Sequence, residues 1–273
     1  MIFDWMHFTY GTYDSREHDL VFAHIDTSEF NSISGTIESY TVFNKRTMSR
    51  IFIGNDYSSM PLSIEVEIVT EDAIALNHGE RTKAENALFN SPSYIPLYFD
   101  LEDDCFHDTF TYYNGEIKRY YLTCRFLNPE RILDQNGLAI GWKCTMECDT
   151  GYMRQEPITV THSHSSTNTS FDLDVVCNGN DYIYPKVTLQ MGSTKGQISI
   201  TNQADDSSRI TKFENLSPSV SVIINGETNY VSGNHYQFMT NRNFPRLVNG
   251  LNSITVNGVS CTLTVEWSNR KYF

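Results

Sequence analysis

The sequence predicts a mainly β protein with one short α-helix. Apolar and polar residues alternate along several segments, such as residues 63–68, where Ile64, Val66 and Ile68 share one face. A period of two is typical of a strand with one buried face. Asn-Gly pairs, which tolerate positive φ at both central positions of a hairpin turn, separate such segments. Helical spacing of apolar residues is clear only over residues 79–89, so we expect a single short helix there.

The C-terminal segment carries the clearest strand signal. Residues 261–267 alternate strictly, and Ile254 and Val256 share a face just upstream. Between the two runs stand Asn257 and Gly258, the residue pair favoured in a type I′ turn. The sequence therefore predicts a terminal β-hairpin.

The remaining strands follow from the same pattern and from the turn residues between them. Further Asn-Gly turns are predicted at 114–115, 136–137 and 225–226. We expect extended segments at residues 8–11, 20–25, 36–43, 50–53, 63–68, 94–101, 116–126 and 138–148, then at 182–190, 196–201, 219–224, 230–240 and in the terminal hairpin.

The length of the chain favours two domains, because 273 residues lie where single cores stop growing. Residues 157–169 are polar, rich in Ser and Thr and without helical period, which is typical of a domain boundary. We expect a first domain over residues 1–157, a linker over 158–169 and a second domain over 170–273. Regularly spaced turns in the second series of strands favour a sandwich or jelly roll.

Composition and charge argue against several classes of protein. No apolar run reaches the length of a membrane span, and the first residues lack a secretory signal, so we expect a soluble chain made in the cytosol without a membrane partner. The formal charge of −13, without a dense Lys/Arg cluster, argues against specific nucleic-acid binding. The six cysteines are expected to be reduced and mostly buried; they are Cys105, Cys124, Cys144, Cys148, Cys177 and Cys261.

The densest acidic group contains Asp100, Glu102, Asp103 and Asp104, with Asp108 nearby. A glycosidase needs two carboxyls that face each other across a cleft, whereas contiguous acids in a loop usually point to solvent. The alternating register of a calcium loop is missing. We therefore interpret the group as a solvated loop and assign no catalytic residue.

Two residue pairs have a spacing that places both side chains on one face of a strand: His162 with His164, and Cys144 with Cys148. Neither pair is accompanied by a second pair at zinc spacing. Phosphate-binding glycine loops, nucleophile elbows and metalloprotease motifs are also absent from the sequence. We therefore expect neither a metal site nor a cofactor.

Aromatic residues of the second domain leave an alternative open. Aromatic rings stack on sugars in carbohydrate-binding sandwiches, although most of these side chains are expected to fill the core. Which residues bind a ligand is unknown at this point. The residues in question are Tyr182, Tyr184, Tyr230, Tyr236, Phe238 and Trp267.

The order of several motifs carries a family resemblance. F-T-Y-G at residues 8–11 precedes Ser15 and H-D-L-V at 18–21, with Asp19 where a glycine is expected. Y-I-P-L-Y-F-D at 94–100 follows the helix. Five further motifs follow in order along the chain: K-R-Y-Y-L-T-C-R-F, G-W-K-C-T-M-E-C-D-T-G-Y, Y-P-K-V-T-L, G-L-N-S-I-T-V-N-G and V-E-W-S-N-R. Over nearly its whole length the chain resembles the distal tail protein (Dit) family of long-tailed, siphovirus-type bacteriophages.

The resemblance implies an N-terminal β-barrel-like or split-barrel domain with one α-helix, followed by a galectin-like or jelly-roll β-sandwich. It also implies a structural role without catalysis, in which a hexameric ring joins the tail tube to the baseplate hub and supports host-recognition components. The implied partners are further copies of the chain, the tail tube protein and the hub or tail-associated protein, with a receptor-binding protein or a host glycan as further candidates. The implied location is the distal end of the virion tail, after assembly in the host cytoplasm.

Two rival hypotheses remain beside this one. The first is a carbohydrate-binding protein that acts through the C-terminal sandwich. The second is a glycoside hydrolase that uses Glu102 and Asp104 or their neighbours.

Overall fold

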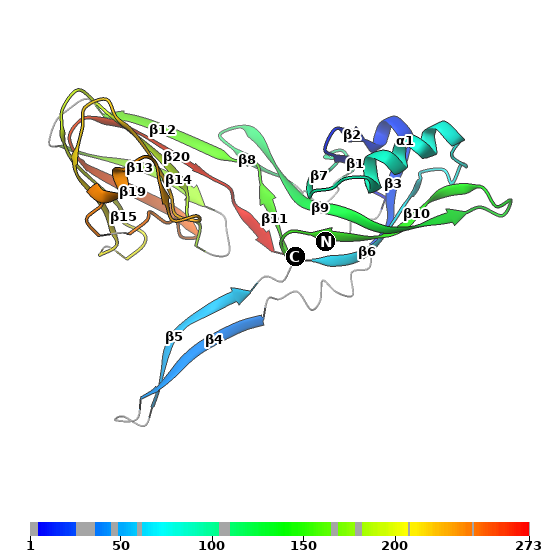
Figure 1. Cartoon of the computed structure of the whole chain (residues 1–273), viewed down its shortest axis with the longest axis horizontal. Helices are drawn as coiled ribbons and strands as arrows, with labels where there is room; N and C mark the ends of the chain where they lie inside the picture. Colours follow the sequence, from blue (N-terminus) through cyan, green and yellow to red (C-terminus); the bar gives the residue numbers. More distant parts are fainter. Residues whose placement is uncertain are drawn as a thin grey trace. The chain divides into compact units, whose positions relative to one another are not determined.

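The computed structural model describes residues 5–25, 36–44, 49–58, 62–103, 110–164, 169–177, 182–206, 208–241 and 243–272. The chain divides into two compact units. Unit 1 comprises Met1–Arg154 with Tyr272–Phe273, and unit 2 comprises Gln155–Lys271. Strands dominate the described residues, and the one α-helix among them lies in unit 1 (Figure 1), which confirms the predicted mainly β class.

Unit 1 is built on an antiparallel sheet that curls into a half-barrel. Its strand order is β2, β1, β7, β9, β10, β6, β3, and β8 and β11 pair with β9 outside this path. A bridge between Met6 and Phe22 connects the segment before β1 to β3, so the two ends of the sheet approach each other. The strands are β1 (Phe8–Tyr10), β2 (Tyr13–Asp14), β3 (Leu20–Ile25), β6 (Ser63–Thr70), β7 (Ile95–Phe99), β8 (Phe110–Tyr113), β9 (Glu116–Leu133), β10 (Ala139–Cys148) and β11 (Tyr152–Gln155), which also pairs with β21 (Arg270–Tyr272).

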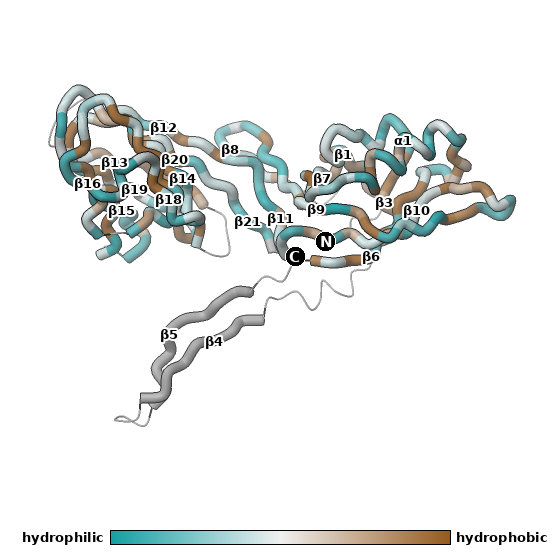
Figure 2. The backbone as a smooth tube through the Cα atoms, in the orientation of Figure 1, coloured by the Kyte–Doolittle hydropathy of each residue, from teal (hydrophilic) through white to brown (hydrophobic). Residues whose placement is uncertain are grey.

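Alternation along these strands decides which side chains enter the core of unit 1. On β10, Trp142, Cys144, Met146 and Cys148 are buried, while Lys143 between them points outward. Figure 2 shows the same alternation of hydrophobic and hydrophilic residues along β9 and β10. The predicted strand at 63–68 is confirmed as β6, with its apolar residues in this core.

Helix α1 (His78–Phe89) confirms the predicted helix. Asn77 caps its N-terminus and forms a capping box with Glu80, which satisfies two backbone N–H groups that a helix start leaves open. Ala84 and Leu88 are buried against the sheet. The Trp142 indole N–H donates to the Glu85 carboxylate at 3.2 Å, which ties the helix to β10.

Strands β4 (Thr36–Asn44) and β5 (Ser49–Ser58) form a separate antiparallel pair. The pairing runs the full length of β4, with a register shift between Tyr40 and Thr41. Within the described ranges no other strand pairs with either of them, so both outer edges carry backbone groups that are available to a further strand.

Unit 2 is a sandwich of two antiparallel sheets (Figure 1). One sheet has the order β12, β20, β14, β17, β18 and the other the order β13, β19, β15, β16. A short 3-10 helix, η3 (His235–Phe238), follows β18. The strands are β12 (Ile158–His164), β13 (Thr169–Cys177), β14 (Lys186–Met191), β15 (Gly196–Asn202), β16 (Ile210–Leu216), β17 (Ser221–Asn225), β18 (Tyr230–Val231), β19 (Gly250–Gly258) and β20 (Cys261–Trp267).

The predicted terminal hairpin is wrong. β19 pairs with β13 and β15, whereas β20 pairs with β12 and β14 in the other sheet. Gly258 has a φ of 134°, and a Cβ there would lie 2.1 Å from the carbonyl oxygen of Gln197. The glycine is therefore required where the chain crosses between sheets. Strict alternation identified both strands correctly, but alternation does not specify which strand is the partner.

The Asn-Gly turn at residues 114–115 is confirmed. Asn114 and Gly115 have φ values of 50° and 83°, and they connect Tyr113 of β8 to its partner Glu116 of β9. Positive φ at both central positions is the backbone geometry that a type I′ turn requires.

The division between the units falls between Arg154 and Gln155, and residues 158–164, expected to be linker, form β12 instead. β12 is an edge strand in which hydroxyl side chains face outward and bond across to β20, as Thr161 does to Thr264 at 3.0 Å. Exposed Ser and Thr can therefore indicate an edge strand as well as a linker.

The chain enters and leaves unit 2 through neighbouring residues. The side-chain amide of Asn269 donates to the amide oxygen of Gln155 at 2.6 Å, and the Gln155 backbone N–H donates to the Asn269 carbonyl at 2.9 Å. Both residues are buried.

Candidate functional site

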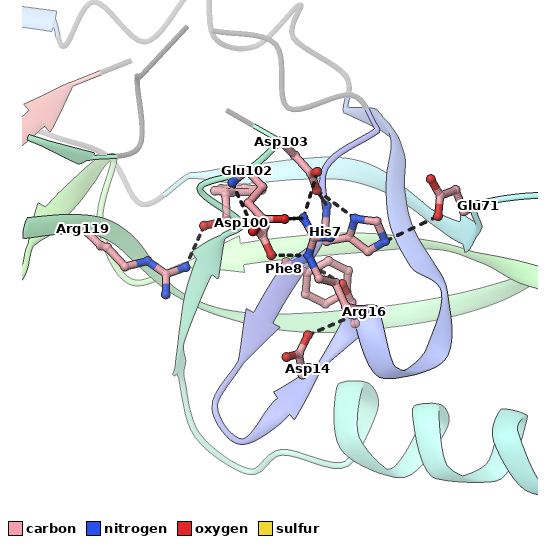
Figure 3. Close-up of polar contacts among 11 residues, drawn as sticks. His7, Phe8, Asp14, Arg16, Glu71, Asp100, Glu102, Asp103 and Arg119 are labelled. Carbon is pink, nitrogen blue, oxygen red and sulfur yellow. Dashed lines mark hydrogen bonds and ion pairs between the residues drawn. The ribbon is translucent and has the colours of Figure 1, made fainter. Parts of the chain in front are cut away.

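A charged network joins the start of unit 1 to the loop after β7 (Figure 3). The backbone N–H of His7 donates to Oδ2 of Asp103 at 2.7 Å, and the His7 ring Nδ1 lies 2.8 Å from the same oxygen. The other ring nitrogen of His7 lies 3.7 Å from the Glu71 carboxylate. His7 is buried, so its ring is held between two acidic groups that come from different segments.

Arg16 binds the same acidic loop from the other side. It lies in a 3-10 helix, η1 (Ser15–His18), which Asp14 caps by accepting the Arg16 backbone N–H at 3.0 Å. Its guanidinium donates to Asp100 and, at 3.1 Å, to Asp103, and it lies 3.5 Å from Glu102. The loop after β7 is therefore tied to η1 by three carboxylates around one cation.

The electrostatics of the network favour a structural role for its carboxylates over a catalytic one. Burial raises the pKa of Asp100, but hydrogen bonds from Arg16 and from the Glu102 backbone, with the charge of Arg16, outweigh it and hold the pKa below its usual value. Asp100 therefore engages Arg16 as an ionised acceptor.

The expectation of a solvated acidic loop needs correction, since Asp100 and Asp103 engage Arg16 and His7 instead of water alone. Glu102, a proposed hydrolase residue, has 83% of its side chain exposed and lies 3.5 Å from Arg16, so it is a surface carboxylate beside a cation. Asp104 and Asp108 lie outside the described residues.

The paired histidines and cysteines do not form a metal site in the part of the chain that the structure describes. His162 and His164 do share a face of β12, where both rings contact Phe171. Cys144 and Cys148 are buried in the core of unit 1. Burial raises the pKa of Cys144 to about 12, which keeps its thiol protonated and unreactive.

All five cysteines that the structure describes are buried reduced thiols, as predicted. Cys105 lies outside the described residues. Cys124 and Cys148 face each other across β9 and β10.

The aromatic residues of unit 2 divide into two groups. Trp267 is buried and belongs to the core, whereas Tyr182, Tyr230 and Tyr236 are 47%, 51% and 38% exposed. The guanidinium of Arg246 lies 3.9 Å from the ring centroid of Tyr182. The structure thus assigns three of the six residues to the surface, while Tyr184 and Phe238 are half-buried.

Arg246 is held in place by Asp205. Its Nε and one terminal nitrogen donate to the two carboxylate oxygens of Asp205 at 2.6 and 2.7 Å. A small cavity of about 10 Å³ beside them is also lined by Asn202 and Arg209. This volume is that of a single water molecule, so the cavity does not accommodate a sugar.

The outer face of β7 and β9 carries tyrosines and arginines that the sequence interpretation missed. Tyr98 pairs directly with Tyr121, with ring centroids 5.2 Å apart, and Arg119 stacks over Tyr98 at 4.8 Å. Farther along, Arg125 lies 5.1 Å from the ring centroid of Tyr94. We call these five residues the tyrosine–arginine face. Alternation along 118–126 could have identified its β9 members, because Tyr120, Leu122, Cys124 and Phe126 are the buried residues between them.

None of the described helices has the length and apolarity needed to cross a bilayer.

The comparisons with known proteins point to phage tails. Residues 151–267 match the family model described as phage tail C-terminal domain. Among solved structures, the chain is similar to the Dit protein of phage SPP1, described as a paradigm of the hub adsorption apparatus in phages that infect Gram-positive bacteria. The alignment covers 97% of this chain and 98% of that chain, with a TM-score of 0.61 and 8% identity.

Weaker similarities are found to chains of the phage p2 baseplate in its activated conformation. The strontium form aligns over 96% of this chain and 97% of that chain, with 10% identity and a TM-score of 0.42. The calcium form gives the same coverages, 9% identity and a TM-score of 0.43. A comparison with curated protein sequences finds no match.

The two informative comparisons agree with each other. The family match lies almost entirely within unit 2, and the SPP1 Dit alignment extends over both units. The chain is therefore Dit-like in fold along nearly its whole length, and its second unit is similar to the phage tail C-terminal domain.

Proposed function

We propose that this protein is a structural distal tail component of a phage virion. In this proposal six copies form a ring that joins the tail tube to the baseplate hub, and the ring supports host-recognition components at the distal end of the tail. The observation that carries the proposal is the combination of a phage tail C-terminal domain in unit 2 with a Dit-like fold across both units.

Unit 1 is the proposed ring-forming and tube-attaching part. Its β4–β5 hairpin supports this assignment, because unpaired strand edges are templates for pairing with another chain and are usually covered in a functional assembly. Unit 2 is the proposed galectin-like sandwich that faces other tail components. Assembly would take place in the host cytoplasm, and the protein would act without catalysis, since Asp100 and Asp103 serve as ion-pair acceptors.

Multi-angle light scattering on the purified chain tests the ring. We expect particles of about six copies in a closed assembly at micromolar concentrations. A chain that stays monomeric over the whole accessible concentration range would contradict the proposal.

A second candidate function is glycan binding by unit 2, favoured by the exposure of Tyr230 and Tyr236. An exposed tyrosine ring offers an apolar surface on which a sugar ring can stack. Glycan-array binding that is lost in Tyr230→Ala or Tyr236→Ala, and retained in Thr188→Ala on the outer face of β14, would support this function. An array without any signal for the wild-type chain would exclude it for the glycans tested.

A further inference from the structure

Two cysteines oppose each other in the core of unit 1. β9 and β10 run side by side (Figure 1), and Cys124 of β9 is the direct partner of Cys148 of β10 in their register. Both side chains are fully buried in the same core. The register places Cys144 opposite Val66 and gives none of the other described cysteines a cysteine partner. In the described strands, two thiols therefore oppose each other at this one place.

The backbone hydrogen bonds identify the type of pair that the two cysteines form. The N–H of Asp149 donates to the carbonyl of Thr123 at 2.9 Å, so this ladder bond joins residues that flank the cysteines. The N–H of Cys148 itself donates to Leu62 at 2.7 Å, on the side of β6. This pattern defines a non-hydrogen-bonded pair of an antiparallel ladder, in which the Cα atoms are only about 4.5 Å apart and the side chains are closest.

The geometry of this pair is suited to a disulfide. Disulfides join residues whose Cα atoms are roughly 4.4–6.8 Å apart, so the separation in a pair of this type falls at the short end of the range. The two thiols are already in contact, because the Cys124 thiol forms a hydrogen bond with that of Cys148. A bond at the short end of the range is strained and is therefore reduced more easily than a relaxed one.

The closed sheet protects both thiols from reaction. Burial raises the pKa of the Cys124 thiol, and the hydrogen bond with Cys148 raises it further, so the nucleophilic thiolate is scarce. Cys148 is the last residue of β10, and a bend follows it before β11 begins at Tyr152. Local opening is easiest where regular structure ends. We therefore expect the thiols to react while the chain folds or when this end of β10 opens.

We propose that Cys124 and Cys148 form an intramolecular disulfide when the protein enters an oxidising environment, and that this bond fastens β9 to β10. The inference rests on the proposed virion function, because a virion component is made in the reducing cytosol and acts outside the cell, where disulfides persist. A strained bond stays reduced in the first setting and accumulates in the second.

Glutathione disulfide is an oxidant that balances the reaction. One cysteine loses its proton to water, and its thiolate attacks a sulfur of glutathione disulfide, which forms a mixed disulfide and releases one glutathione thiolate. The other cysteine also loses its proton, and its thiolate attacks the protein sulfur of the mixed disulfide and releases the second glutathione thiolate. The two cysteines lose two protons and two electrons, and one glutathione disulfide becomes two molecules of glutathione.

Incubation of the folded, full-length chain with glutathione tests the proposal. One sample receives reduced glutathione and the other oxidised glutathione, both in urea below the unfolding transition, where local opening is frequent. Unreacted thiols are then blocked with N-ethylmaleimide, and the chain is digested without reductant. Mass spectrometry is expected to find a peptide pair joined through Cys124 and Cys148 in the oxidised sample alone. Dithiothreitol should separate the pair again.

The bond should also raise the thermal stability of unit 1. A cross-link between β9 and β10 restricts the unfolded chain, so we expect the midpoint of the unit 1 transition to rise by about 5–10 °C on oxidation. Differential scanning calorimetry of the oxidised and reduced samples measures this shift. The comparison is made on one wild-type protein, so it does not depend on whether a variant folds.

Cys144→Ala is the matched control, because it removes a buried thiol from the same strand and the same core while leaving the pair intact. The linked peptides and the shift on oxidation are expected in this variant as in the wild type. Cys148→Ala should show neither, and its midpoint should be the same in both glutathione buffers.

Two results would overturn the proposal. The first is a wild-type chain that keeps both thiols after equilibration with oxidised glutathione, and the second is a linked peptide that joins either cysteine to a different one. Light scattering on the same samples separates this inference from the proposed function. A chain that forms the bond but stays monomeric supports the cross-link and contradicts the ring, whereas a chain that assembles without forming the bond contradicts the cross-link and leaves the ring in place.

Discussion

At the scale of single residues, Arg16 connects parts of unit 1 that are far apart in sequence. Asp100 and Asp103 lie 84 and 87 positions beyond it, and both bind its guanidinium. Exposed ion pairs contribute little individually, but a cation with several ordered acceptors contributes more. The Arg16 network is therefore a plausible target for measuring how firmly the loop after β7 is held.

We predict that Arg16→Gln lowers the free energy of unfolding at neutral pH by about 1 kcal/mol, the upper part of the range for partly exposed ion pairs. In the wild type the folded pKa of Asp100 lies below its ordinary value, so its contribution to stability is full above that ordinary pKa and is lost as the pH falls through the lower folded pKa. Urea unfolding at pH 7 and pH 3 should therefore show a smaller difference between variant and wild type at pH 3. Lys195→Gln, at an exposed turn, is the control; an equal difference at both pH values would contradict the argument.

At the scale of elements, the two glycines that bound β19 have different physical roles. Both have positive φ, 96° at Gly250 and 134° at Gly258. A Cβ at Gly250 would meet nothing within 4 Å, whereas one at Gly258 would collide with backbone. Substitutions at Gly250 and Gly258 therefore distinguish two contributions to the free energy of unfolding: the cost of a left-handed backbone conformation and the cost of a steric clash.

Gly250→Ala is expected to lower the free energy of unfolding of unit 2 by about 1–2 kcal/mol, the cost of a left-handed conformation for an L-residue. Gly258→Ala should cost about 1–3 kcal/mol more, because the clash forces β15 or β19 to shift. Chemical denaturation followed by far-UV circular dichroism measures both. Equal losses in the two variants would mean that the crossing between the sheets is not constrained as described.

Strand β19 shows which features of the fold can be predicted from the sequence and which cannot. Period-two alternation located β6, β10, β19 and β20, because facing toward a core is a local property of the strand. Pairing is a long-range property, and so the terminal hairpin was wrong although its strands were right. The Arg16 network left no local signal, since its residues are separated by most of unit 1. The tyrosine–arginine face did leave one, in the polar and aromatic residues that alternate with the buried residues of β9.

At the scale of the whole molecule, the two units have separate cores. Leu122 is buried in unit 1 and Leu263 in unit 2. Because each core is formed within its own unit, a cavity in one core is expected to destabilise that unit first.

Leu263→Ala should lower the stability of unit 2 by about 2–5 kcal/mol, with unit 1 retaining most of its protection from amide hydrogen exchange. Leu122→Ala should give the reverse pattern. Hydrogen exchange read out by mass spectrometry assigns the loss to each unit. Uniform loss of protection across the chain in both variants would show that the units unfold as one.

The paired amides of Gln155 and Asn269 place the two ends of unit 2 side by side. A sandwich whose ends are neighbours can be removed as a cassette and another spliced in its place without stretching the polypeptide on either side. Exchange of residues 155–269 for another sandwich would therefore leave the sheet of unit 1 with the same two attachment points.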